Sequence, residues 1–162
     1  GKAEPIYVTA YRRAKGNEKD ANWRFPKGAT QGIVGKISNI TFSNIKCNSE
    51  NGIYVSAETA DKIDNILFDQ VDVSIEKTTL FPGGIYDRRP SEVEGFVKGR
   101  TSGFYFDTAE HISMLNCSVK WGYNKPDYFA YAIESNHVGH LEITGFSGLS
   151  AFPDKFESIK KR

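Results

Sequence analysis

A nine-residue pattern occurs four times in this chain and constrains its fold more than any other feature. In each copy the second, fourth and seventh positions are apolar. Apolar side chains two residues apart mark a short strand with one buried face, and the wider step between the fourth and seventh positions predicts a bend. The copies are NITFSNIKC at Asn39–Cys47, NILFDQVDV at Asn65–Val73, HISMLNCSV at His111–Val119 and HLEITGFSG at His140–Gly148.

The first and sixth positions of each copy are predicted to be corners of the chain. Asn, Gly and, less often, His tolerate the left-handed backbone that a corner requires, so Gln70 fits this role poorly. The repeating unit is therefore corner, strand, corner, strand. The corner residues are Asn39, Asn65, His111 and His140 at the first position, and Asn44, Gln70, Asn116 and Gly145 at the sixth.

A further short apolar strand precedes each copy, with its centre at Tyr7, Tyr54, Tyr105 and, more weakly, Ile133. Each turn of the repeat then carries about three short strands and spans some twenty to thirty residues, which is typical of a solenoid. The chain is thus expected to be all-β, a single-stranded parallel β-helix (solenoid) of about four to five rungs with long side loops. A β-sandwich or jelly roll is the alternative, but it would not explain why corner residues recur in register.

Length and charge narrow the possibilities further. The 162 residues are enough for one domain, so residues 1–162 are expected to form a single β-helix domain or the C-terminal fragment of a longer one. The net charge of +1 gives no general attraction to nucleic acid or membrane. No apolar stretch approaches the roughly 20 residues needed to cross a bilayer.

Two cysteines, Cys47 and Cys117, lie on the apolar side of their repeats. Their repeats are two steps apart in the predicted stack. At about 4.8 Å for each stacked strand, that separation is too large for a disulfide. Both are therefore expected to be buried free thiols.

Three segments do not follow the repeat, and in a solenoid such insertions collect on one side and build the binding surface. The insertions are Tyr11–Gly35, Thr78–Ser102 and the aromatic-rich Trp121–Tyr131.

The C-terminal stretch Phe152–Arg162 is a separate case and is expected to be loosely docked.

Longer phrases of the sequence resemble a known enzyme family. ISNITFSNIKCNSENGIYV, FPGGIYDRRP and GFYFDTAEHISMLNCSVKWGYNKPDYFAYAI together resemble the C-terminal part of glycoside hydrolase family 28, in particular its polygalacturonase-like members. The resemblance covers nearly the whole chain. It implies a right-handed β-helix, hydrolysis of pectic polysaccharide that contains galacturonic acid, and a periplasmic or secreted location with the signal peptide outside this chain. It implies no cofactor.

The catalytic motifs of that family do not occur here. The family carries Asn-Thr-Asp, Asp-Asp, Gly-His-Gly and Arg-x-Lys motifs, and a rung with a substrate-contacting tyrosine follows the last of them. The stretch EPIYVTAY resembles that rung and places Tyr11 at the tyrosine. The chain is therefore expected to start downstream of the catalytic aspartates and to be inactive alone. The alternatives are a non-catalytic β-helix module that binds acidic polysaccharide and a purely structural piece.

Other candidate chemistry is weak. Inverting glycosidases need two carboxyl groups about 6.5–9.5 Å apart. The pairs Asp61/Asp64, Asp69/Asp72 and Glu92/Glu94 are interpreted as solvated turns rather than catalytic pairs. His137 has no ligand partner at a suitable spacing, so no metal site is expected.

Sugar binding is the better-supported prediction, because the insertions combine aromatic and basic residues. Aromatic rings stack on pyranose rings, and arginine pairs with uronate carboxylates. The alternative is that these side chains only pin the loops, with Asp87 paired to Arg88 or Arg89. The candidate substrate-binding residues are Tyr11, Arg12, Arg13, Trp23, Tyr86, Asp87, Arg88, Arg89 and Trp121.

The expected partners are an acidic polysaccharide or oligosaccharide, and neither nucleic acid nor membrane. A β-helix with an open N-terminal end exposes strand edges and apolar core. The chain is therefore expected to self-associate through that end or to pair there with an N-terminal part.

Overall fold

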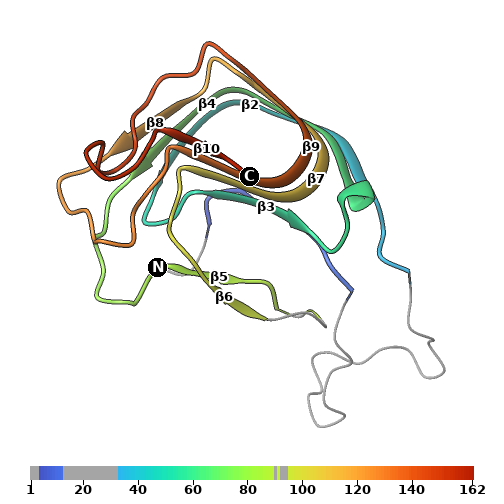
Figure 1. Cartoon of the computed structure of the whole chain (residues 1–162), viewed down its shortest axis with the longest axis horizontal. Helices are drawn as coiled ribbons and strands as arrows, with labels where there is room; N and C mark the ends of the chain where they lie inside the picture. Colours follow the sequence, from blue (N-terminus) through green and yellow to red (C-terminus); the bar gives the residue numbers. More distant parts are fainter. Residues whose placement is uncertain (1–3, 13–32, 90, 92–94) are drawn as a thin grey trace, which may run out of the picture.

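A computed structural model describes residues 4–12, 33–89, 91 and 95–162 (Figure 1). The protein is all-β with a mostly parallel sheet, and the described residues contain no α-helix. One 3-10 turn, η2, covers Ala60–Lys62. The strands are β1 (Tyr7–Ala10), β2 (Ile37–Ser49), β3 (Ile53–Ala57), β4 (Ile63–Ile75), β5 (Ile85–Asp87), β6 (Phe96–Lys98), β7 (Phe104–Leu115), β8 (Ser118–Trp121), β9 (Ile133–Thr144) and β10 (Ile159–Lys161).

The parallel strands form two rows. In the first row β1, β3, β7, β9 and β10 follow one another. In the second row β2, β4, β7 and β9 follow one another, and β8 pairs with the last part of β4, beyond the part that pairs with β7. The long strands β7 and β9 bend and take part in both rows, and Figure 1 shows β2, β4, β7 and β9 following the same curve alongside one another. The strands β5 and β6 form a separate antiparallel pair.

The register confirms the alignment of the four sequence repeats. Ile40 pairs with Ile66, Ile66 with Ile112, and Ile112 with Leu141. In a parallel ladder, equivalent side chains lie directly above one another, so each apolar column of the repeat becomes a column of the core.

The predicted corners are right at the sixth position and half right at the first. The sixth-position residues all have positive φ, including Gln70 at 54°. At the first position Asn39 and Asn65 have positive φ, whereas His111 and His140 do not. In β7 and β9 the turn lies three residues earlier, at Thr108 (61°) and His137 (53°).

The turn moves because two rungs take a shorter path between the rows. Ten residues lead from Ser56 in β3 to Ile66 in β4, and this path includes the 3-10 turn η2. Five residues lead from Asp107 to Ile112, the positions that pair with them in β7. The direct path must therefore turn at once, at the residue after Asp107.

Replacing Thr108 with Asn is expected to raise the free energy of unfolding by about 1 kcal/mol. A β-branched residue is strained in the left-handed region, whereas Asn tolerates it. Thermal or urea denaturation of the variant checks this, with Thr144→Asn on β9 as a control at a strand position. A variant less stable than the parent would show that the Thr108 side chain contributes more than its backbone strain costs.

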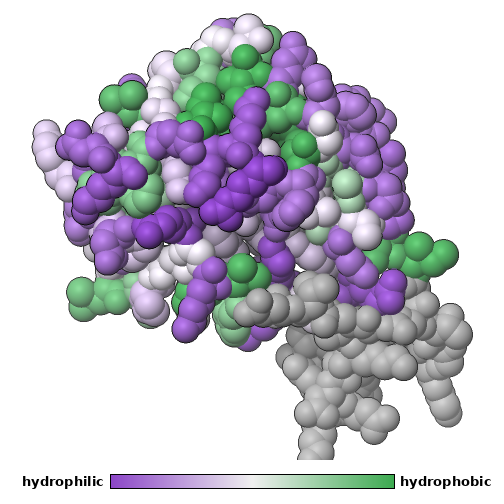
Figure 2. Space-filling model, viewed as in Figure 1, coloured by the Kyte–Doolittle hydropathy of each residue, from purple (hydrophilic) through white to green (hydrophobic). Residues whose placement is uncertain are grey.

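Burial is deepest in the middle of the stack. Ile66, Phe68, Ile112 and Met114 are at most 1% exposed, and residues of both rows complete the core around them. Their equivalents on β2 are only half-buried, among them Ile40 and Phe42. Among the described residues β2 pairs with β4 alone, so its other edge is open. On the face seen in Figure 2, where β9 and β10 are nearest, apolar residues also reach the surface.

The C-terminal stretch is firmly docked, so the expectation of a loose end is wrong. Ile159 pairs with Ile133, and the Arg162 amide donates to the Ser135 carbonyl at 2.8 Å. The stretch docks because β10 extends the first row by one more strand. Cys47 and Cys117 are free and buried, which confirms their prediction. No helix among the described residues is long and apolar enough to span a membrane.

Candidate functional site

The outer face of the first row carries a stack of tyrosine rings, which we call the tyrosine stack: Tyr7, Tyr54, Tyr86 and Tyr105. The register places Tyr7, Tyr54 and Tyr105 in one column, with successive ring centroids 5.6 and 5.5 Å apart. Tyr86 of β5 packs against both of the last two rings, 4.6 Å from Tyr54 and 4.7 Å from Tyr105. Its hydroxyl donates to the Arg100 carbonyl at 2.7 Å. These contacts dock the β5–β6 pair on the outside of the first row.

Arg88 follows β5 and contacts the tyrosine stack, the predicted site residue Tyr11 and Asp107, which was not predicted. Its Nε donates to the Tyr54 hydroxyl at 2.7 Å and its Nη2 to Asp107 Oδ2 at 2.8 Å. Its guanidinium also lies over the Tyr11 ring, 5.2 Å from the centroid. Burial alone would lower the pKa of Arg88, but the bond to Tyr54 and the charge of Asp107 raise it. Arg88 is therefore a charged side chain held in one orientation.

Tyr11 lies beside Arg88 just beyond the end of β1, and Arg12 is the next residue of the chain. The Tyr11 hydroxyl shares a hydrogen bond with Ser56 Oγ, and burial raises the pKa of Tyr11. The Arg12 amide donates to Glu58 Oε2 at 3.0 Å, and its guanidinium is 3.7 Å from Glu58 Oε1. The Arg12 side chain is 44% exposed, against 14% for Arg88, so Arg12 is the more accessible cation.

Asp87 pairs with Arg89 and not with Arg88. Arg89 donates to both carboxylate oxygens of Asp87, at 2.8 and 2.7 Å, and its guanidinium stacks on Phe96 at 3.8 Å. The structural interpretation of the YDRR sequence predicted a pair with Arg88 or Arg89, and the structure has the pair with Arg89. The structure thus brings three of the nine candidates together around Tyr54, namely Tyr11, Tyr86 and Arg88, and Arg12 is the residue after Tyr11. Arg13 and Trp23 lie outside the described residues.

In the two carboxylate pairs that the structure describes, Asp64 and Asp72 are engaged with other groups. Asp64 binds His111 Nδ1 at 2.8 Å and Lys36 at 2.9 Å, and these contacts lower its pKa. Asp72 accepts a hydrogen bond from Ser118 at 2.5 Å. Glu92 and Glu94 lie outside the described residues. Within the part of the chain that the structure describes, no three His, Cys, Asp or Glu residues are grouped to hold a metal ion.

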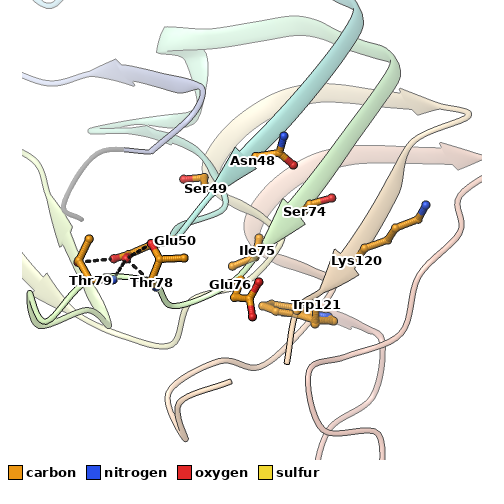
Figure 3. A pocket seen from close by; sticks show the side chains of 11 residues that line it. Asn48, Ser49, Glu50, Ser74, Ile75, Glu76, Thr78, Thr79, Lys120 and Trp121 are labelled. Carbon is orange, nitrogen blue, oxygen red and sulfur yellow. Dashed lines mark hydrogen bonds between the residues drawn. The ribbon is translucent and has the colours of Figure 1, made fainter. Parts of the chain in front are cut away.

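Trp121 lies elsewhere, at a groove of about 680 Å³ along the ends of β2, β4 and β8 (Figure 3). We call it the tryptophan groove. The parallel register aligns three rungs there, so Asn48, Ser74 and Lys120 form one column and Ser49, Ile75 and Trp121 the next. The lining residues are Asn48, Ser49, Glu50, Ser74, Ile75, Glu76, Thr78, Thr79, Lys120, Trp121 and Gly122.

Glu50, the residue after β2, anchors the loop that follows the neighbouring strand β4. Its carboxylate binds Lys77 at 2.6 Å and accepts hydrogen bonds from the Thr78 amide and hydroxyl at 2.8 and 2.7 Å. The Thr79 amide and hydroxyl also donate to it, and Figure 3 shows these contacts at one end of the groove. Burial opposes ionisation, but the hydrogen bonds from Lys77 and Thr78 outweigh it and hold the pKa of Glu50 well below its usual range.

Glu76 repeats this arrangement one rung later. Its Oε1 accepts hydrogen bonds from the Tyr123 and Asn124 amides at 3.1 and 3.2 Å. Two consecutive rungs therefore use a glutamate after the second-row strand to fix the loop of the following rung. In the third rung the equivalent residue is Gly122, where a Cβ would lie 2.6 Å from Glu76 Oε2.

Sequence reasoning missed Asp107, Tyr54 and Tyr105, although a signal was present. Aligning IYVS with FYFD places Tyr54 above Tyr105 and Ser56 above Asp107, and the structure has both pairs. It also missed Glu4, whose half-buried carboxyl has a pKa raised to about 7 by burial, with a smaller contribution from the Asp87 charge. No sequence pattern marks that residue.

Glu50, Glu76 and Lys120 could not be recognised from sequence either, since their roles depend on which loops dock beside them.

Comparison of the chain with known proteins found no match: no family model matches it, and no match was found among the curated proteins or the solved structures.

Proposed function

We propose that this chain is a right-handed parallel β-helix that forms the C-terminal part of a polygalacturonase-like glycoside hydrolase acting on pectic polysaccharide. The support for the fold is the pair of parallel rows, in which each strand stacks on its equivalent from the next repeat around one apolar core. The support for the substrate class is the sequence resemblance together with the residues gathered around Tyr11.

The cluster of Tyr11, Arg12 and Arg88 is the observation that carries this proposal. An arginine can bind a uronate carboxylate through two parallel N–H donors, and an aromatic ring can pack on a sugar. Arg88 stacks on Tyr11 and is oriented by Asp107, so the ring and the charge are placed before a ligand arrives. Arg12, the residue after Tyr11, is a more exposed cation paired with Glu58. Preorganised groups of this kind bind with less entropic cost.

In this proposal the chain supplies one side of the substrate cleft and the acid and base lie outside these 162 residues. The half-buried apolar side chains of β2 then become the place where a further rung stacks, or where a second copy associates. The second candidate function is a stand-alone module that binds acidic polysaccharide. It is favoured by the fact that the cations and the ring all belong to this chain.

Titration with oligogalacturonate tests the proposal. Calorimetry should show binding that weakens as salt is added, because the contact is ionic. Arg12→Ala and Tyr11→Ala should each weaken binding about tenfold, which is the loss expected for one charge-assisted hydrogen bond or one ring contact. Arg162→Ala removes an exposed arginine elsewhere and serves as the control. No new reducing ends should form from polygalacturonate.

Two results would contradict it. If oligogalacturonate does not bind, or if the Tyr11 and Arg12 variants bind as well as the parent, the site is wrong. If reducing ends are released by the purified chain, the inference that it lacks the acid and base is wrong.

A further inference from the structure

The tryptophan groove is separate from the Tyr11 cluster. Ser49 and Glu50 precede the start of β3, whereas Ser56 and Glu58, which contact Tyr11 and Arg12, lie at its end or just beyond it. A strand rises about 3.3 Å per residue, so the five residues of β3 separate the two places by roughly 15 Å. The groove also has a different character, since it holds two carboxylates and one lysine rather than a group of arginines.

The tryptophan is held in place but not covered. Its indole Nε1 donates to the Leu149 carbonyl at 2.8 Å, and its ring packs on the buried Phe129 at 5.3 Å. The ring is nevertheless only half-buried and lines the groove. An aromatic ring fixed in this way gives a large contact area with little loss of conformational entropy on binding.

The polar groups around the ring divide into those already used and those still available. Glu50 accepts hydrogen bonds from the Lys77 side chain and the Thr78–Thr79 loop, so its carboxylate is occupied. Glu76 uses Oε1 for the Tyr123–Asn124 loop, and its Oε2 accepts no hydrogen bond from the described residues. Gly122 keeps the space next to Oε2 free, since a Cβ there would lie only 2.6 Å away.

Donors lie along the same groove. Asn48, Ser74 and Lys120 form one column on neighbouring strands, and Figure 3 shows Lys120 extending from β8 on the far side of Ser74 from Asn48. Lys120 makes no ion pair with a described residue. The groove therefore offers a ring, one carboxylate oxygen, an amide, a hydroxyl and an ammonium group.

We propose that the tryptophan groove is a binding site for a neutral saccharide. Sugar hydroxyls both donate and accept hydrogen bonds, which suits Glu76 Oε2 as an acceptor and Lys120, Asn48 and Ser74 as donors. Trp121 and Lys120 are successive residues of β8 and face opposite sides of the strand, so the C–H face of one sugar unit packs on Trp121 while a different unit of the oligosaccharide reaches Lys120. A uronate is disfavoured, because Glu50 is already paired with Lys77 and the negative charge of the uronate would face the carboxylate of Glu76. The volume of about 680 Å³ is within the range of small-molecule sites.

The test uses the whole chain and four neutral probes: galactotetraose, arabinotetraose, xylotetraose and cellotetraose. The chain has two tryptophans, so a Trp23→Phe background leaves Trp121 as the fluorescent reporter. At least one probe should change its emission and show saturable binding by calorimetry. Glu76→Gln keeps an Oε1 acceptor for the loop amides and removes the charge. This variant and Lys120→Ala should each weaken binding about fivefold to tenfold. Lys161→Ala, on an exposed part of β10, is the matched lysine control.

The proposal is overturned if none of the four probes binds at millimolar concentration, or if both groove variants bind as well as the control. It is also overturned if oligogalacturonate quenches Trp121 and the groove variants weaken that binding, since the ligand would then be anionic. The proposal does not depend on the Tyr11 cluster. Loss of oligogalacturonate binding in Arg12→Ala with intact neutral-sugar binding would support two separate sites.

Discussion

Replacing Glu50 with Gln is expected to lower the free energy of unfolding by about 2–4 kcal/mol. The Glu50 and Lys77 side chains are 9% and 12% exposed, so the substitution leaves a nearly buried ammonium without its counter-charge. It also weakens the acceptor for the Thr78 and Thr79 amides, which tie the following loop to the rung. Urea denaturation followed by circular dichroism measures the difference.

The effect of Glu50 should depend on pH in a defined direction. Its pKa in the folded protein is lowered below the ordinary 4.5, so its ionised form is favoured by folding. Its contribution is therefore complete above about pH 4.5 and is lost as the pH falls towards the lowered value. The stability difference between the parent and Glu50→Gln should be constant near neutral pH and shrink in acid.

Two further variants make this prediction specific. Asp61→Asn removes a carboxylate from an ion pair with Lys62 in which the Asp61 side chain is 63% exposed, and should hardly change the unfolding midpoint. Adding Lys77→Met to Glu50→Gln removes the unpaired charge and should recover part of the loss. A Glu50→Gln protein as stable as the Asp61→Asn protein would show that the loop is held by other contacts.

Phe68→Ala is expected to lower the free energy of unfolding by about 3–5 kcal/mol. Phe68 is fully buried, and its ring lies 5.2 Å from Phe42 and 5.7 Å from both Phe104 and Phe106. Removing the ring leaves a cavity between three rungs that the parallel ladders on both sides keep open.

Phe42→Ala is the matched control, because Phe42 is the same residue type in the same column one strand away. It is only half-buried on the open side of the stack, so the loss should be about 1–2 kcal/mol. Chemical denaturation of both variants gives the comparison. Equal losses would mean that the outer side of β2 is covered in solution, as stacking of a further rung or a second copy would do.

Much of the fold could be predicted from the sequence. The apolar columns that contain Ile40 and Phe42 were placed in the correct register, and the all-β class followed from them. This was possible because each repeat contacts mainly its neighbours, so a local pattern repeated in order specifies the pairing. The turn at Thr108 and the docking of β10 were missed. The turn depends on the length of the path between two rows, and the docking of β10 on a strand whose own sequence carries no repeat.

The candidate site could be predicted only in part, and the reason is physical. Composition marked Tyr11, Arg88 and Trp121 as binding residues, but nothing in the sequence says which of them meet. That depends on where the insertions dock. Only the tertiary structure pairs Arg88 with Asp107, leaves Asp87 to Arg89 and places Trp121 at a different groove. The sequence by itself determined the rows and most corners, which are set by neighbours in the repeat. The side-chain partners were decided by long-range packing of loops that follow no repeat.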